Sequence, residues 1–480
     1  MKSRIQVPIA RAVARMFLLT ALIVAGDPSS IFAAPVASAS GGDLRVGAAR
    51  IDITPSNLTN LNSFGGNFSD VHDPIFARVL IVDNGASTVA FVALDLIEIG
   101  DTTKVRQRIQ NELGIPVDHI LITASHDHNA PRAGSVTAGG LAHGNTPETD
   151  AFTDTLYDKI LDALKQAKGS LKPARFGLGV GKADVNINRD EYKPPRGWGL
   201  GYNPDRQSDK TVWVMKFETT AGEPIAVLFN YAVHSTAALG TGRLSGDLAG
   251  EAERFVEQKY GNKIVALYTM GSAGDQNPKY TGNNPAAPRP AGAGGNGGPG
   301  GPGGPGGGGG AGGGNAARSP QEAAERSAAA FDAVHAEGFM LGSEVVRVSA
   351  GIQKMSSSAQ INAAERIVSC PTKQGTNQLA DMKQEKVATM PLHLGLILIN
   401  DVALTGVSGE VVTNIYWHLK KASPLSNTIM LTIANDRLGY IADDAAYDTP
   451  YFEVNGTPLA RGCAEDAIVN NLVEMIGQYK

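Results

Sequence analysis

The sequence has few cysteines, few aromatic residues and no excess of positive charge. Two of its 480 residues are cysteines, Cys370 and Cys463, aromatic residues make up 6%, and the formal net charge is -5. A chain of this charge has no basic field that would attract phosphate backbones, so we expect no nucleic-acid partner. The two cysteines suit an oxidising compartment and could pair with each other, a point that the sequence leaves open.

Three common catalytic motifs are also missing. The chain has no His-Glu-x-x-His metal motif, no Gly-x-Ser-x-Gly nucleophile turn and no phosphate loop ending in Gly-Lys-Ser/Thr. The usual metalloprotease, α/β-hydrolase and P-loop interpretations therefore lack their residues. The Gly-rich stretch GSAGDQNP, which starts at Gly271, is interpreted as a tight loop that places Asp275 and Asn277 near a cleft.

The N-terminus has the pattern of an export signal. Basic residues precede the apolar stretch MFLLTALIVAG, and in the following stretch APVASAS the residues Ala37 and Ala39 fit a cleavage site. The apolar stretch is too short to span a bilayer comfortably. We expect residues 1–40 to be a signal peptide, with a retained membrane anchor as the alternative, and the mature protein to be periplasmic or secreted.

The rest of the chain alternates between strand and helix patterns. Strands are predicted at 41–55, 76–84, 88–96, 119–125, 212–219, 224–234, 264–271, 392–407 and 427–436, and helices at 102–114, 148–169, 247–261, 319–346 and 464–479. The fold class is therefore α/β (mixed α+β). We expect residues 41–480 to form a single large catalytic domain built on mixed β-sheets with flanking helices.

A Gly/Pro-rich tract interrupts this pattern at residues 285–315. It has no large apolar side chains that could repay the entropy of ordering, so we expect a disordered surface insertion. Collagen is the alternative, but the triplet period is too short and irregular to support it. Because helix and strand patterns resume after the tract, we expect the same domain to continue.

Several of the nine histidines stand at the ends of apolar strands. His126 and His128 end one strand, His234 ends another, and Glu410 follows a third in the same way. On an extended chain His126 and His128 point to the same side, so they could hold one metal ion or divide into a ligand and a catalytic partner. Two imidazoles and a carboxylate form a set that zinc accepts. Each residue taken alone is better explained as a structural or surface residue.

Seven short motifs together resemble the catalytic domain of the neutral ceramidases. They occur in that family's order between about Arg45 and Tyr447: ITASHDHNAP, NINRDEY with Arg189, YAVHSTA, RLSGDLAGEA, GSAGDQNP, VSGEVVT and ANDRLGYIAD. Members of this family are zinc amidases that cut the N-acyl bond of ceramide. The resemblance implies a metal-dependent amidohydrolase with Zn2+ as its cofactor and a lipid or small-molecule amide as its substrate, with peripheral membrane contact as a further implication.

The resemblance also implies a role for each site residue. His126, His234, Glu410 and Tyr440 resemble the zinc ligands, whereas His128 and Arg189 resemble the catalytic residues that orient the scissile carbonyl and stabilise its developing charge. A zinc-activated water would attack the amide, and His128 would pass a proton to the leaving nitrogen.

The sequence departs from the family in three places. Asn277 stands where the family has a serine, which rules out a nucleophilic serine at this position. Tyr451 or Phe452 stands where the family has a tyrosine near the substrate. The chain ends soon afterwards, so we expect no immunoglobulin-like C-terminal domain. Two alternatives remain: a zinc hydrolase of a different amide, ester or lactone, and a non-catalytic binding protein on the same scaffold.

Overall fold

The computed structural model describes residues 41–134, 145–281, 319–373 and 388–480, all within one unit that runs from Ala37 to Lys480. The expected signal peptide and the Gly/Pro-rich tract lie outside the described residues. Within these ranges, no helix combines the length and the apolar character that a membrane crossing needs.

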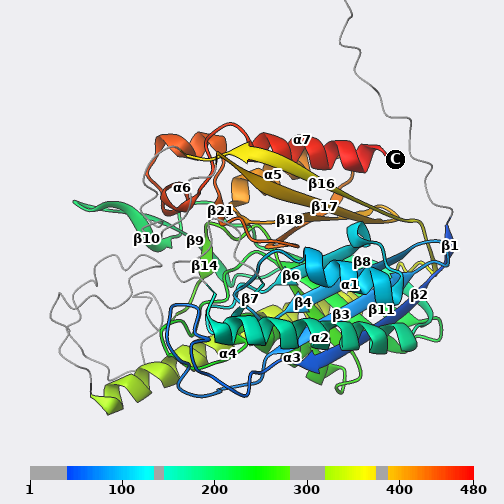
Figure 1. Ribbon diagram of the computed structural model, residues 1–480, viewed down its shortest axis with the longest axis horizontal. Helices are drawn as coiled ribbons and strands as arrows, with labels where there is room; N and C mark the ends of the chain where they lie inside the picture. The colour runs from blue at the N-terminus through cyan, green and yellow to red at the C-terminus, as the bar shows by residue number, and fades with distance from the viewer. Residues whose placement is uncertain (1–40, 135–144, 282–318, 374–387) are drawn as a thin grey trace, which may run out of the picture. The chain divides into compact units, whose positions relative to one another are not determined.

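Two β-sheets stacked on each other form the centre of the fold (Figure 1). The larger sheet has eight strands in the order β13 (Val265–Met270), β12 (Pro224–Tyr231), β11 (Thr211–Thr219), β8 (Lys172–Lys182), β2 (Arg45–Asp52), β3 (Phe76–Asp83), β4 (Thr88–Leu94) and β6 (Ile120–Ala124). Its inner neighbours are antiparallel, whereas β12 with β13 and β4 with β6 are parallel. Because β13 also contacts β6, the two edges of the sheet lie close together.

The smaller sheet has four strands in the order β16 (Ile361–Pro371), β17 (Thr389–Ile399), β18 (Val402–Val407) and β20 (Asn427–Thr432). Apolar side chains from both sheets, such as Phe91 and Leu404, share one buried core. Helices α5 (Thr413–Ala422) and α7 (Ala464–Gly477) share a second core with the outer face of the smaller sheet. The outer face of the larger sheet packs against α1 (Thr103–Leu113), α2 (Pro147–Gly169), α3 (Asp247–Lys259) and α4 (Pro320–Gly351). The chain therefore forms four layers, helix, sheet, sheet and helix, and the expected α/β class is confirmed.

Short elements complete the fold near the sheet edges. They are β1 (Gly42–Asp43) with β15 (Ser358–Ala359), β5 (Glu98–Ile99) with β7 (Arg132–Ala133), β19 (Glu410–Val411) with β21 (Tyr440–Ile441), the sheet of β10 (Gly197–Asn203), β9 (Asn186–Lys193) and β14 (Gln276–Pro278), helix α6 (Phe452–Gly456) and the 3-10 turns Val117–His119 and Asp444–Asp448. The stretch GSAGDQNP thus includes a short strand, β14, in addition to the expected loop.

The sequence pattern does not predict strand β8, and its glycines explain why. Gly177, Gly179 and Gly181 alternate along one face of the strand, where apolar residues would normally mark the core side. A side chain at Gly179 would come within 2.6 Å of Val348 on α4. The missing side chains allow the helix to approach the sheet closely, and this leaves no periodic apolar signal in the sequence.

The two cysteines meet in the structure. Cys370 at the end of β16 and Cys463 before α7 form a disulfide, with 5.7 Å between their Cα atoms and 93 residues between them in the sequence. The bond ties the last helix to the edge of the smaller sheet, which answers the question that the sequence leaves open.

Candidate metal centre

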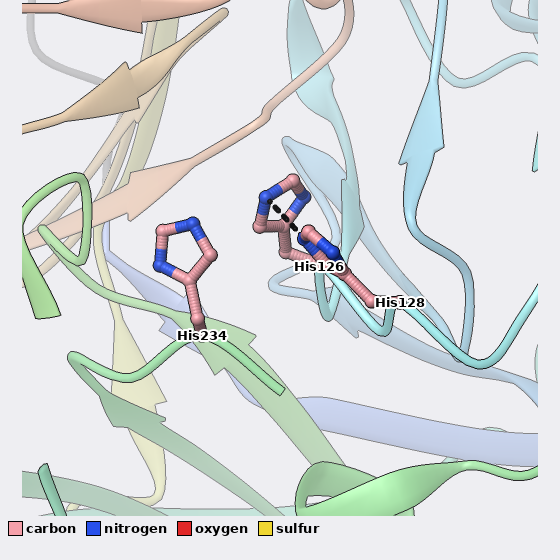
Figure 2. A group of neighbouring side chains, drawn as sticks. All are labelled: His126, His128 and His234. Atoms are coloured by element: carbon pink, nitrogen blue, oxygen red, sulfur yellow. Dashed lines mark hydrogen bonds between the residues drawn. The ribbon is translucent and has the colours of Figure 1, made fainter. Parts of the chain in front are cut away.

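Three histidines gather where two strands of the larger sheet end (Figure 2). His126 and His128 follow β6, and His234 follows β12. His126 adopts a positive φ of 56°, a conformation that few residues other than glycine take, and this turn sends the chain away from the sheet. The backbone N–H of His128 then donates to the Ser235 carbonyl at 3.1 Å. Together the turn and this bond join the two strand ends and bring the three rings together.

Hydrogen bonds fix the orientation of two of the rings. Nδ1 of His126 lies 2.7 Å from the Ile97 carbonyl oxygen, and Nδ1 of His234 lies 3.1 Å from the Gln276 carbonyl oxygen. A carbonyl only accepts, so each Nδ1 carries the proton and each Nε2 presents a lone pair. This arrangement is typical of histidines that bind metal through Nε2.

Glu410 faces both of these lone pairs. Its Oε2 lies 3.1 Å from Nε2 of His126 and 3.3 Å from Nε2 of His234, and all three side chains are at most 1% exposed. Burial lowers the pKa of His234 to about 3, and Arg189 acts in the same direction, so this ring is neutral. A neutral Nε2 and a carboxylate oxygen are both electron-pair donors, so a cation between them would stabilise this contact.

Arg437 supports Glu410 from behind. Its Nη2 donates to Oε1 of Glu410 at 3.1 Å, while its Nε pairs with Glu98. Burial acts to raise the pKa of Glu410, but the neighbouring His126, His234 and Arg437 hold that pKa well below its usual range. Glu410 is therefore ionised, with Oε2 directed at the two imidazoles.

Tyr440 and Arg189 complete the cluster from other elements. Tyr440 on β21 pairs in register with Glu410 on β19. The guanidinium carbon of Arg189, on β9, lies 5.3 Å from the centre of the Tyr440 ring. Nη1 of Arg189 lies 3.1 Å from Nε2 of His234 and donates to Oδ1 of Asn277 at 3.2 Å. Burial raises the pKa of Tyr440, so without a cation its hydroxyl stays protonated.

His128 differs from the other two histidines. Its Nε2 lies 3.1 Å from Nε2 of His126, but among the described residues its buried Nδ1 has no hydrogen-bond partner. Burial lowers the pKa of His128 well below its usual value, and His126 and His234 act in the same direction. His128 therefore lies beside the donor atoms as a neutral ring but lacks the carbonyl contact that orients His126 and His234.

The spacing of these donor atoms fits a small tetrahedral cation. Ligands at about 2.0–2.1 Å from a tetrahedral zinc ion lie roughly 3.3–3.4 Å apart. Oε2 of Glu410 lies 3.1 Å from Nε2 of His126 and 3.3 Å from Nε2 of His234. Nitrogen and carboxylate oxygen donors are also the types that zinc accepts. The residues present therefore fit a zinc ion.

All six residues that the sequence predicts for the site lie in this cluster: His126, His128, Arg189, His234, Glu410 and Tyr440. Of the two candidates for the family's tyrosine, Phe452 is the one in contact with the cluster, 5.6 Å from the Tyr440 ring, whereas Tyr451 packs against Trp198.

The sequence reasoning missed three charged residues. Arg437 and Glu98 fix Glu410, and Glu453 accepts a hydrogen bond from Arg189 at 2.8 Å. Arg437 lies inside the motif ANDRLGYIAD and could have been noticed there. Glu453 has no comparable signal, because it lies in a five-residue helix outside all seven motifs.

Comparison with known proteins gives relatives of one kind. No family model matches the sequence. Neutral ceramidase A of Dictyostelium discoideum is 26% identical over 272 residues, which cover 50% of this chain and 36% of the relative. Neutral ceramidase of Drosophila melanogaster is 28% identical over 268 residues, again 50% of this chain and 36% of the relative. The match therefore spans little more than a third of either relative.

The fold is similar to solved ceramidase structures. The crystal structure of neutral ceramidase from Pseudomonas aeruginosa gives a TM-score of 0.68 with 16% identity and covers 90% of this chain and 74% of that one. A structure of ceramidase complexed with C2 gives a TM-score of 0.66 with 17% identity. The sequence relatives and the shared fold therefore support a similarity of this chain to the neutral ceramidases.

Proposed function

We propose that the protein is an exported, zinc-dependent hydrolase that cleaves the N-acyl amide bond of a ceramide-like sphingolipid with a zinc-activated water. One observation carries the proposal: His126 and His234 donate their Nδ1 protons to backbone carbonyls and turn both Nε2 lone pairs toward the Glu410 carboxylate. The names of the relatives support ceramide as the type of substrate.

The proposed ligands are His126, His234, Glu410 and Tyr440. Arg437 holds Glu410 in place, and two carbonyls hold the imidazoles, so the donor set is oriented before any metal arrives. A zinc ion in this site would supply hydroxide near neutral pH and polarise the acyl carbonyl.

His128 is proposed to move protons. It is neutral and half-buried beside the proposed ligands, and it lacks the contact to a backbone carbonyl that orients His126 and His234. A neutral imidazole can take a proton from the attacking water and deliver one to the leaving nitrogen. The ring of Phe64, with its centre 5.4 Å from that of His128, limits the motion of the imidazole.

Arg189 is proposed to stabilise the negative charge that develops on the acyl oxygen. Its guanidinium is buried next to His234, where a fixed cation acts more strongly than it would in water. Asn277 accepts a hydrogen bond from the same guanidinium and carries no nucleophilic hydroxyl. We therefore assign the nucleophile to water rather than to the chain.

The cellular location follows from the same proposal. Residues 41–480 would form the catalytic domain after removal of the signal peptide, in the periplasm or outside the cell. The Cys370–Cys463 disulfide supports an oxidising compartment.

Metal analysis combined with a hydrolysis assay tests the proposal. We expect purified protein to contain about one zinc ion per chain and to release fatty acid from N-acyl-sphingosine, with loss of activity on chelation and recovery when zinc is restored. Metal-replete protein that binds N-acyl-sphingosine but does not cleave it would favour the non-catalytic binding alternative. Cleavage of a matched ester or lactone alone would point to the related hydrolase.

A further inference from the structure

Arg189 reaches the metal centre from a strand that has no other residue in the site, so something must hold its long side chain in place. Strand β9 belongs to the small sheet with β10 and β14. The guanidinium carbon lies 5.3 Å from the centre of the Tyr440 ring and 5.4 Å from that of Phe452. These rings restrict the guanidinium but do not choose which of its N–H groups faces His234.

The contact with Glu453 determines which N–H group of Arg189 faces His234. Oε1 of Glu453 accepts a hydrogen bond from Nε of Arg189 at 2.8 Å, and the two side chains are 2% and 4% exposed. With Nε engaged by Glu453, the opposite edge of the planar guanidinium presents Nη1 to His234 and Asn277. A buried, charge-assisted hydrogen bond of this kind fixes orientation because water cannot replace it.

A second carboxyl group, that of Asp190, lies behind Glu453. Oε2 of Glu453 and Oδ1 of Asp190 are both buried and have no donor among the described side chains and backbone groups. Burial raises the pKa of Asp190 to about 9, and Glu453 adds to this rise, so Asp190 carries a proton near neutral pH. Nη1 of Arg206 lies 3.4 Å from the other Asp190 oxygen. The proton of Asp190 therefore lies near Glu453, whose Oε1 engages Arg189.

We propose that Glu453 is a positioning residue that orients the Arg189 guanidinium toward the metal centre. This inference rests on the proposed function, because it assigns Glu453 a role in that reaction. The plain alternative is that Glu453 only neutralises a buried cation and contributes to stability. The two roles predict different behaviour of a Glu453 variant. If Glu453 only stabilises the fold, the variant loses stability but its folded form is active. If Glu453 positions Arg189, the folded variant is also impaired at the site.

Three variants separate these roles. Glu453→Ala removes the acceptor, and Glu453→Gln keeps an oxygen for Nε but loses the charge. The matched control is Glu365→Ala, because Glu365 accepts from the buried Arg106 at 2.9 Å and contacts none of the six site residues. The measurements are zinc content, melting temperature, kcat and KM on N-acyl-sphingosine, and the affinity of the zinc-loaded protein for octanoate, a carboxylate that Arg189 should bind.

We expect Glu453→Ala to lower kcat/KM by roughly 10–100-fold, with zinc content unchanged and octanoate binding weakened in parallel. Glu453→Gln should show a smaller loss of both. Glu365→Ala should lose stability but keep octanoate affinity and kcat/KM within about twofold of the wild type. If Glu453→Ala performs as well as Glu365→Ala in both assays, the positioning role is wrong and Glu453 is structural.

These measurements also distinguish a failure of this inference from a failure of the proposed function. If the wild type cleaves no N-acyl-sphingosine, the proposed function fails, and octanoate binding still compares the variants. A crystal structure of Glu453→Ala decides without any ligand. We expect Nη1 of Arg189 to leave His234 and Asn277, and an unmoved guanidinium would overturn the inference.

Discussion

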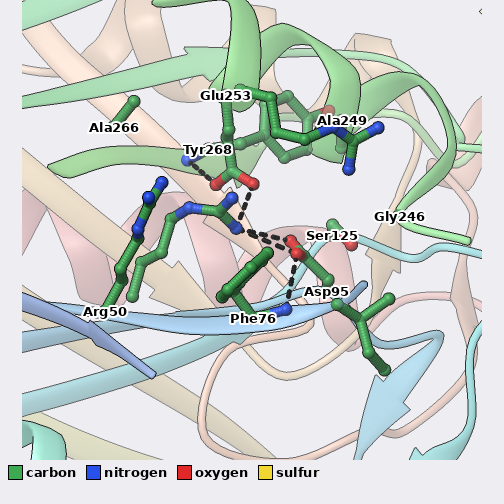
Figure 3. Close-up of polar contacts among 12 residues, drawn as sticks. Arg50, Phe76, Asp95, Ser125, Gly246, Ala249, Glu253, Ala266 and Tyr268 are labelled. Carbon is green, nitrogen blue, oxygen red and sulfur yellow. Dashed lines mark hydrogen bonds and ion pairs between the residues drawn. The ribbon is translucent and has the colours of Figure 1, made fainter. Parts of the chain in front are cut away.

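Two polar clusters lie buried in this protein, and they are built in opposite ways. The first surrounds Arg78 on β3, whose partners include Asp95 and, from helix α3, Glu253 (Figure 3). Nη1 of Arg78 donates to Asp95 at 2.9 Å, and Nη1 and Nε pair with Glu253 and Glu257 at 2.5 and 3.3 Å. The second is the candidate metal centre, where three imidazoles lie close together (Figure 2) and two of them face the Glu410 carboxylate.

The two clusters differ in how their charges are balanced. Around Arg78, the carboxylates meet cations and backbone donors, including the backbone N–H of Tyr268 and of Phe76. Burial raises the pKa of Glu253 well above its usual range, with Arg78 opposing and Asp95 adding, so a proton removes the remaining charge. At the candidate metal centre, Oε2 of Glu410 lies beside Nε2 of both His126 and His234, while Arg437 donates to the other Glu410 oxygen. Paired charges like those around Arg78 hold elements together, whereas a group of neighbouring electron-pair donors is suited to a metal ion.

The largest expected effect comes from removing a proposed ligand. His126→Ala should lose bound zinc and hydrolysis together, because the remaining donors no longer surround one point. Zinc content by atomic emission and turnover on N-acyl-sphingosine measure the two quantities. Full zinc content in this variant would show that His126 is not a ligand.

A smaller but still large effect is expected at the neighbouring histidine. His128→Ala should keep zinc yet lower kcat by roughly 10²–10⁴-fold, because it removes a proton carrier and leaves the ligands in place. The same two measurements apply, with His126→Ala as the reference. If His128→Ala loses zinc as completely as His126→Ala, the three histidines form the ligand set and the division between them is wrong.

Disrupting the Arg78 cluster should lower the stability of the protein and leave metal binding unchanged. Arg78→Met leaves buried carboxyl groups without their cation and should lower the free energy of unfolding by about 3–5 kcal/mol. Urea denaturation measures this change, and zinc content of the folded variant should stay at the wild-type level. As a control, Arg461→Met removes a pair whose partners are 48% and 74% exposed and should cost at most about 1 kcal/mol. A loss of zinc in folded Arg78→Met would show that the two clusters are coupled.

The smallest effect is expected at Asn277, where the sequence departs from the neutral ceramidase pattern that it resembles. Asn277→Ala removes one acceptor from Arg189 but no proposed ligand or nucleophile, so turnover should fall by no more than about tenfold. Steady-state kinetics with zinc content as a check measure this change. Abolished turnover with zinc intact would instead assign the chemistry to the GSAGDQNP loop.

The types of site residue and their places at strand ends could be predicted from the sequence. His126 and His234 follow apolar runs, and strands that end near one another deliver such residues to a common edge. The choice of ring nitrogen could not be predicted, because it depends on which carbonyl each Nδ1 meets. For His126 that carbonyl belongs to Ile97, 29 residues away.

Local patterns in this sequence determined most of the helices, about half of the strands, the α/β class and the residues available for metal chemistry, because burial imposes a period of two or 3.6 residues on neighbouring positions. Only the tertiary structure decided that Glu410 meets His234 across 176 residues and that Glu453 meets Arg189 across 264. It also decided the Cys370–Cys463 bond and the approach of α4 to the glycines of β8. These contacts depend on how the four layers pack, and packing leaves no periodic mark on a short stretch of sequence.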